Sequence, residues 1–240
     1  MAPQDTRRSI LNAAAAEFLE HGFAAASMAA IAAHLGLTKG ALTHHFPAKA
    51  DLAHGMLAEA FIILDRAYLQ SESVVPEAGL ERLLDFHLRM GIEAVRSPMM
   101  VAAVVLYADR SSPVYQFEPL LVRWMDLLET DVRAAYNQGA LPPQTDVRAA
   151  AEFLLTNMMG TVVLRTRRPE RDSEDRLRSL RFALRGIGAA EPDVMVDKAI
   201  ALAIQGGYMP DHLGALTEQA FAQLDTRAEA RPADATATPQ

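Results

Sequence analysis

The sequence contains no cysteine, and this absence excludes several kinds of site. Without thiols the 240-residue chain cannot form disulfides, use a thiolate nucleophile or bind zinc through cysteine. The histidines provide no replacement, because the sequence has no His-Glu-x-x-His or Glu-x-x-His motif. A glycine-rich phosphate loop is also missing. We therefore expect no metal, no cofactor and no enzymatic activity, and stoichiometric zinc or iron in the purified protein would contradict this.

Long hydrophobic runs are absent too. The strongest apolar run covers residues 98–107, which is much shorter than the roughly 20 residues that a membrane span needs. Near the N-terminus, polar and acidic residues interrupt the apolar run that follows Arg7 and Arg8, so no signal peptide is expected. Together with the lack of cysteine, this predicts a cytoplasmic protein without a membrane partner.

Excess positive charge is lacking as well. The net charge is −7, and residues 1–52 contain four basic and four acidic side chains, so this segment is neutral. The whole deficit lies in residues 53–240, where 19 basic side chains face 26 acidic ones. An acidic body opposes general attraction to DNA or anionic membranes, so any contact with nucleic acid should be confined to the N-terminal segment.

What the sequence does have is helical periodicity. Nearly every segment shows the apolar spacing of an amphipathic helix, and no segment alternates as a strand would. We predict an all-α fold with a three-helix N-terminal domain over residues 1–47, a larger helical bundle over 48–230 and a disordered tail over 231–240. The expected helices cover residues 6–20, 28–35, 39–46, 48–70, 77–95, 98–109, 116–138, 146–166, 173–187, 193–205 and 212–229.

Residues 27–52 have the local chemistry of two short helices joined by a tight turn. Ser27 is a good N-cap for the first helix, and Gly36 can end it because glycine adopts positive φ without steric cost. Thr38 caps the second helix, and Pro47 ends it while suiting the start of another. This order predicts a helix-turn-helix followed directly by a long helix.

The outward face of the second short helix carries groups that suit DNA. Gly40 permits close approach of the backbone to phosphate, and Lys39 is a cationic donor. Thr43 and His44 can donate further hydrogen bonds. His44 and the neighbouring His45 point to different sides of the helix, so they cannot chelate a metal together.

Residues 8–52 resemble the DNA-binding domain of TetR-type transcriptional repressors. The family signature Gly-x-Ser/Thr-x-Gly-x-x-Tyr-x-His-Phe-x-x-Lys-x-x-Leu is matched in register by Gly36, Thr38, Gly40, His45, Phe46, Lys49 and Leu52. The chain departs from it at Thr43, where the family usually has a tyrosine on a phosphate, and it has alanine at 26, 29, 30 and 50, where the family is usually polar. The resemblance implies a homodimer that places residues 38–44 in the major groove of a pseudo-palindromic operator. The DNA-binding residues would be Ser27, Thr38, Lys39, Gly40, Thr43, His44 and Lys49.

Residues 97–164 resemble a TetR subgroup, the actinobacterial receptors for γ-butyrolactone and related furan-type signals. The likeness lies in residues 119–124 and 137–141 and in the helix with Ala149, Gly160 and Thr161. In that subgroup a tryptophan in the place of Trp124 lines the signal pocket, and the family's last two large helices form the dimer's four-helix interface. The resemblance implies a small-molecule effector.

The residues themselves leave two interpretations of this region open. Trp124, the only tryptophan, lies on an apolar stripe and suits either an ordinary core or a pocket wall. Polar groups within the apolar helix 146–166 either bond to their own helix carbonyls or meet a ligand. Either ordinary core packing or an adaptable pocket wall would account for the methionines at positions 90, 99, 100, 158 and 159. The predicted ligand-binding residues are Trp124, Tyr107, Met99, Leu120, Thr156 and Thr161.

The sequence thus predicts a homodimeric DNA-binding regulator that a small, largely apolar molecule, such as a γ-butyrolactone-type signal, releases from its operator. The alternative is a helical protein that binds a ligand or a partner and has weakened or lost DNA binding. The alanine-rich segment around residues 26–33 motivates this alternative.

The neutral charge of residues 1–52 predicts modest DNA affinity with a shallow salt dependence. Few phosphate contacts release few counterions, so the slope of log K against log salt concentration should fall well below the magnitude of about ten found for a strongly basic repressor. Titrating operator DNA at several salt concentrations measures this slope. A slope near ten would contradict the prediction.

Overall fold

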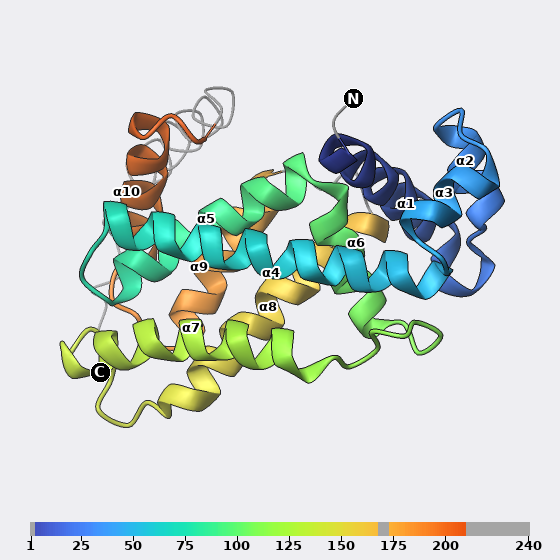
Figure 1. The fold of residues 1–240 in the computed structure, drawn as a ribbon. Helices are drawn as coiled ribbons and strands as arrows, with labels where there is room; N and C mark the ends of the chain where they lie inside the picture. Colours follow the sequence, from blue (N-terminus) through green and yellow to red (C-terminus); the bar gives the residue numbers. More distant parts are fainter. Residues whose placement is uncertain (1–2, 168–172, 210–240) are drawn as a thin grey trace, which may run out of the picture.

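The computed structural model describes residues 3–167 and 173–209, and within these ranges every regular element is an α-helix. This confirms the predicted all-α class. The expected helix over 212–229 and the tail over 231–240 lie outside the described residues. The helices are α1 (Pro3–Ala25), α2 (Met28–His34), α3 (Lys39–His45), α4 (Lys49–Val74), α5 (Leu80–Arg96), α6 (Pro98–Ala108), α7 (Glu118–Asn137), α8 (Val147–Arg167), α9 (Ser173–Gly186) and α10 (Pro192–Gln205) (Figure 1).

Local capping fixes the two short helices as predicted. The Oγ of Ser27 accepts hydrogen bonds from the amides of Ala29 and Ala30 at 3.2 and 3.4 Å, at the start of α2. The Oγ1 of Thr38 accepts one from the amide of Ala41 at 3.1 Å, at the start of α3. Between them Gly36 has φ +65°, the left-handed conformation expected where a helix ends on glycine. The sequence prediction of a helix-turn-helix is confirmed.

Some helix ends differ from the predicted ones. Helix α1 was expected to end near Glu20, but it continues to Ala25 across Gly22, whose φ of +76° bends the chain. Helix α4 extends one turn beyond the predicted end, to Val74, because the fully buried Ser71 donates its hydroxyl to the carbonyl of Ala67 at 3.0 Å. Ser71 thus ties this last turn to the core, while Ser73 and Val74 at its end are exposed.

Helix α4 connects the two parts of the fold. Figure 1 shows α1, α2 and α3 gathered at one end of α4, while α5, α6 and α7 pack against α4. One stripe of α4 is at most 3% exposed and consists of Leu52, Met56, Ala60 and Ile63. Burial of each larger side chain in this stripe stabilises the fold by about 1.5–3 kcal/mol, so α4 is held firmly against both parts.

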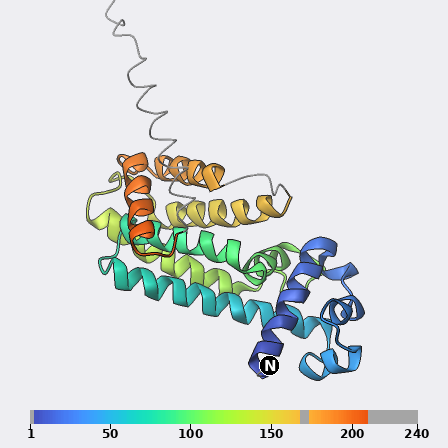
Figure 2. The same ribbon diagram turned by 90° about the horizontal axis from the view of Figure 1, so that it is seen from above.

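The body places α8 and α9 side by side on the side away from α4 (Figure 2). Helix α6 packs instead against α1 and α4, near the N-terminal helices. By length and composition alone, residues 147–164 of α8 could span a membrane, and so could α5 with α6 if they were not bent by 99° at their junction. Core helices of soluble proteins have the same character, so this carries little weight.

A buried ion pair joins α4, α5 and α7. The Nε of Arg82 donates to Oδ1 of Asp131 at 2.7 Å, and its Nη2 donates to the hydroxyl of Tyr68 at 2.9 Å. The amide of Gly79 adds a bond to the same carboxylate oxygen at 3.3 Å. Burial raises the pKa of Asp131, an effect that the Arg82 guanidinium opposes, and burial also raises the pKa of Tyr68 to about 12. The pair depends on Arg82 to keep a buried carboxylate charged.

Replacing Arg82 with methionine should lower the free energy of unfolding by about 3–5 kcal/mol, because it leaves the carboxylate of Asp131 buried and unpaired. Urea unfolding at fixed protein concentration measures the change. As a matched control, Arg133→Met removes the exposed pair with Glu129 on α7 and should cost less than about 1 kcal/mol. Equal losses in the two variants would contradict this account.

Candidate functional site

Helix α3 presents one polar face to solvent. Lys39, Gly40 and His44 are exposed, while Leu42 on the opposite side is fully buried. Thr43 is half-buried, and its hydroxyl donates to the carbonyl of Gly40 at 3.0 Å. The structure therefore brings the predicted reading residues together on one accessible surface.

The two cap residues lie at the edges of this surface. Ser27 and Thr38 are both exposed, and each uses its hydroxyl oxygen to accept from helix amides. A hydroxyl can accept and donate at the same time, so capping leaves the proton of each group available to a phosphate oxygen. Ser27 thus caps α2 and Thr38 caps α3, and both residues remain exposed to solvent.

Lys49 has a different environment from the one expected for a phosphate ligand. Its ammonium donates to the carbonyls of Phe23, Ala24 and Ala26 at 2.6, 3.0 and 2.9 Å, and it lies 4.7 Å from the centre of the Phe23 ring. A lysine has three N–H donors, and these contacts use all of them. In this conformation Lys49 fastens the end of α1 to the start of α4 and has no donor left for DNA.

The same corner is also held from the body. Oδ2 of Asp109, the residue that follows α6, accepts a hydrogen bond from the amide of Phe23 at 3.2 Å. Burial acts to raise the pKa of Asp109, but the hydrogen bonds from Ser111 and Phe23 lower it overall. Phe23 thus gives its carbonyl to α4 and its amide to the end of α6.

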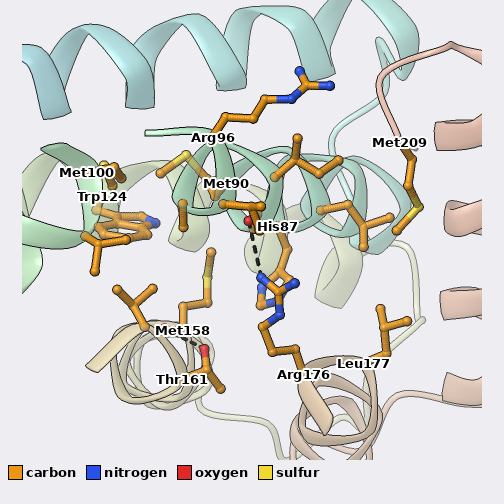
Figure 3. A pocket seen from close by; sticks show the side chains of 17 residues that line it. His87, Met90, Arg96, Met100, Trp124, Met158, Thr161, Arg176, Leu177 and Met209 are labelled. Carbon is orange, nitrogen blue, oxygen red and sulfur yellow. Dashed lines mark hydrogen bonds between the residues drawn. The ribbon is translucent and has the colours of Figure 1, made fainter. Parts of the chain in front are cut away.

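A largely apolar cavity of about 200 Å³ lies inside the body (Figure 3). It is bordered by helices α5 to α9 and by the residues that follow α10. Three of the five methionines singled out in the sequence contribute to its wall. Its labelled lining residues are His87, Met90, Arg96, Met100, Trp124, Met158, Thr161, Arg176, Leu177 and Met209.

Only two of the six predicted ligand-binding residues border this cavity, namely Trp124 and Thr161. Met99 and Leu120 are 1% and 4% exposed but lie elsewhere in the core. Tyr107 is half-buried near the end of α6, and Thr156 faces solvent on α8. The structure does not bring these four residues to the cavity.

The indole of Trp124 is the most distinctive group in the cavity. The residue is 3% exposed, and the part of the chain that the structure describes offers its Nε1 no hydrogen-bond partner. In Figure 3 this nitrogen faces the interior of the cavity. An unsatisfied buried donor costs about 1–3 kcal/mol, so an acceptor brought by a ligand would recover that energy. Thr161 differs, because its hydroxyl already donates to the carbonyl of Met158 at 2.8 Å.

His87 and Arg176 meet on another side of the cavity and were not predicted from the sequence. Burial lowers the pKa of His87 to about 4, and the positive charge of Arg176 contributes, so His87 is neutral at pH 7. The Nη1 of Arg176 donates to the carbonyl of Gly91 at 3.3 Å, across the gap from α9 to α5. No pattern in the sequence pairs these residues, because they come from helices that are far apart in the chain.

The residues after α10 complete the wall. The hydroxyl of Tyr208 donates to Asp85, and the Arg89 guanidinium lies 3.8 Å from the centre of the Tyr208 ring. The Nη2 of Arg96 donates to the Tyr208 carbonyl at 3.2 Å. These contacts anchor the neighbouring Met209, which is 6% exposed and lines the cavity.

The helix-turn-helix and its surroundings match a known family model. Residues 10–56 match the model described as bacterial regulatory proteins, tetR family. Residues 10–56 therefore form a TetR-type DNA-binding domain. Among curated proteins, this chain is similar to the HTH-type transcriptional regulator SrpR of Pseudomonas putida, with 26% identity over 61% of this chain and 68% of the relative.

Solved structures of TetR-type proteins extend the likeness to the body. One is a γ-butyrolactone receptor described as ArpA-like, with a TM-score of 0.71 and 26% identity over 85% of this regulator and 100% of that chain. Another is CprB from Streptomyces coelicolor in complex with its operator, with a TM-score of 0.68 and 25% identity over the same shares. These likenesses indicate a DNA-binding transcriptional regulator, not an enzyme.

The Lys49 contacts generate a test that separates folding from DNA recognition. Lys49→Met should lower the free energy of unfolding by about 2 kcal/mol, because hydrogen bonds to a charged donor are lost, and should weaken DNA binding through the displaced α1–α2 corner. Lys39→Met should weaken DNA binding without a change in stability, since Lys39 is exposed. Urea unfolding and operator titration of both variants check this. Unchanged stability in Lys49→Met would contradict the structural role of Lys49.

Proposed function

We propose that this TetR-type regulator is a homodimeric repressor that a small, largely apolar molecule releases from its operator. The observation that carries the proposal is the indole N–H of Trp124, which is buried in the wall of an apolar cavity and has no hydrogen-bond partner among residues 3–167 and 173–209. Such a cavity with a few placed polar groups is the usual form of a small-molecule site. The ligand needs an oxygen acceptor for Trp124 and apolar surface for the methionines.

A γ-butyrolactone-type signal meets both requirements through its ring carbonyl and its apolar chain. Support comes from the similar solved structure described as a γ-butyrolactone receptor. The same relatives support operator binding, since one of them was solved with its operator sequence. The exposed residues of α3 would enter the major groove in each protomer, as recognition helices of helix-turn-helix proteins do.

An exposed apolar face on α8 and α9 supports the dimer. Phe153 and Leu164 on α8 are 48% and 47% exposed, and Phe182 on α9 is 63% exposed. Large apolar side chains grouped on two neighbouring helices favour burial against a second protomer. Pairing these helices in two copies would form the four-helix interface that the family resemblance implies, and it would set the distance between the two α3 helices.

The path from the cavity to DNA would run through α6. Met100 near the start of α6 lines the cavity, while Asp109 after its end holds the amide of Phe23 at the α1–α2 corner. A ligand that favours a shifted α6 would therefore move the reading head. Because both heads must fit adjacent half-sites, a changed separation weakens DNA binding.

Trp124→Phe tests the proposal because it keeps the aromatic ring and removes the N–H. We expect operator affinity near that of the unchanged protein, and a ligand concentration for half-release that rises about 5- to 20-fold. Thr161→Val is the matched control in the same cavity, since its hydroxyl is already bonded to Met158, and it should change release less. A mobility-shift assay with upstream DNA and a series of lactones and furans measures both quantities.

The results also distinguish the alternative of a ligand-binding protein without DNA binding. Equal loss of DNA binding and release in Trp124→Phe would make Trp124 an ordinary core residue. No shift of operator DNA at low salt, with the dimer intact by light scattering, would favour the alternative. Two observations favour this alternative, namely the neutral charge of residues 1–52 and the occupied donors of Lys49.

A further inference from the structure

Helix α4 lies on the side of the body away from α8 and α9 (Figure 2), and it presents one face to solvent. On this face Ile62 and Leu69 are 57% and 64% exposed. Seven residues separate them, so they lie on the same side of the helix, about 10 Å apart. The exposed or half-exposed residues that we term the α4 face are Ala58, Ile62, Asp65, Arg66, Leu69 and Ser73, and most of them border one shallow groove.

Two ion pairs hold the charged side chains of the α4 face along its two edges. Asp65 accepts a hydrogen bond from Arg123 of α7 at 2.9 Å, and Arg66 lies 3.4 Å from a carboxylate oxygen of Glu93 on α5. Asp65 and Arg66 differ by about 100° around the helix axis, so the two pairs lie on opposite sides of the apolar stripe. Each edge therefore carries one positive and one negative group.

This charge pattern favours a second copy of the same face over a strongly charged partner. The four ionised groups sum to zero, so the face attracts neither nucleic acid nor a strongly acidic or basic protein. When two copies meet about a twofold axis that crosses the helices, each edge meets the same edge of the other copy. Carboxylates of one copy then lie near guanidinium groups of the other, which makes the face complementary to itself.

The position of the two large apolar side chains fits an antiparallel pair of helices. With the twofold axis between residues 65 and 66, Ile62 of each copy lies opposite Leu69 of the other. Helices α1, α2 and α3 project at one end of α4 (Figure 1), so an antiparallel pair also keeps these parts of the two copies away from each other.

We propose that the α4 face binds the α4 face of a second copy as an antiparallel helix pair. The contact is small, so the association is weak. Together with the proposed dimer through α8 and α9, it joins two dimers into a tetramer. The two starts of α4 in the joined copies are then about 50 Å apart, so the tetramer holds two separate operators and the contact does not complete a single one.

Sedimentation velocity of the full chain over a range of concentrations tests the contact. We expect a dimer that converts to a tetramer as the concentration rises toward about 100 μM. Leu69→Glu should weaken this conversion at least about tenfold, because each contact loses two buried leucines and gains two charges. Val194→Glu is the matched control, since Val194 is 60% exposed on α10, and it should leave the conversion unchanged. Both variants should bind a single operator as the unchanged protein does.

A charge exchange distinguishes a second copy from another kind of partner. Asp65→Arg leaves each α7 edge with two positive groups, so it should weaken tetramer formation. Combining it with Arg123→Asp gives the edge one charge of each sign again and should restore the tetramer, because every copy carries the same exchange. If the single change has no effect, or if the double change restores nothing, the proposed pairing of the edges is wrong.

Cross-linking tests the antiparallel direction, and the cysteine-free chain suits it. Mixed Ala58→Cys and Ser73→Cys proteins should form a covalent pair with a short bis-maleimide reagent, because these positions face each other across the contact. Either variant alone should cross-link little, since its two copies lie about 22 Å apart. Efficient cross-linking of Ala58→Cys alone would indicate a parallel pair and overturn the proposed arrangement.

The outcomes separate this inference from the proposed function. If the protein stays a dimer at every concentration, the inference is overturned while the dimer through α8 and α9 stands. If Leu69→Glu yields monomers and Phe182→Glu leaves the dimer intact, the α4 face is the dimer contact, so the inference stands and the proposed α8–α9 dimer fails. A monomer at every concentration overturns both.

Discussion

The position of the DNA-binding helices depends on one ammonium group and the three carbonyls that surround it. Lys49 closes the end of α1, and Asp109 takes the amide of Phe23 from the opposite side. This arrangement requires the sharp bend at Gly22, where φ is +76°. A positive group from α4 and a negative group after α6 therefore hold one corner, and the orientation of α2 and α3 follows from it.

Helix α6 connects the cavity to this corner. Met100 near its start lines the cavity, and Asp109 after its end binds the amide of Phe23. Core packing is close to that of a crystal and resists gradual deformation, so in the proposed mechanism a shift of α6 at Met100 would be passed along the helix to Asp109. The helix is nearly all apolar and mostly buried, so its side chains are closely packed against their neighbours. In the proposed mechanism the ligand acts on this helix and not on the DNA-binding residues themselves.

Local sequence chemistry was enough to predict the caps at Ser27 and Thr38 and the turn at Gly36, because each depends on neighbours a few residues away. Helix α8, however, has apolar side chains on all its sides. Its periodicity therefore could not predict that Thr161 faces the cavity and Thr156 faces solvent. His87 and Arg176 are close only because α5 and α9 share one cavity. Lys49 matched a family position, yet a signature does not reveal whether its donors are taken by the protein.

The Tyr208 anchor has a consequence for the shape of the cavity. Tyr208 binds Asp85 and Arg89 on α5, and the adjoining Met209 closes part of the cavity. The shape of the cavity is thus set partly by the short stretch that follows α10. Exchanging Met209 would resize this chamber and leave α2 and α3, at the other end of the molecule, as they are.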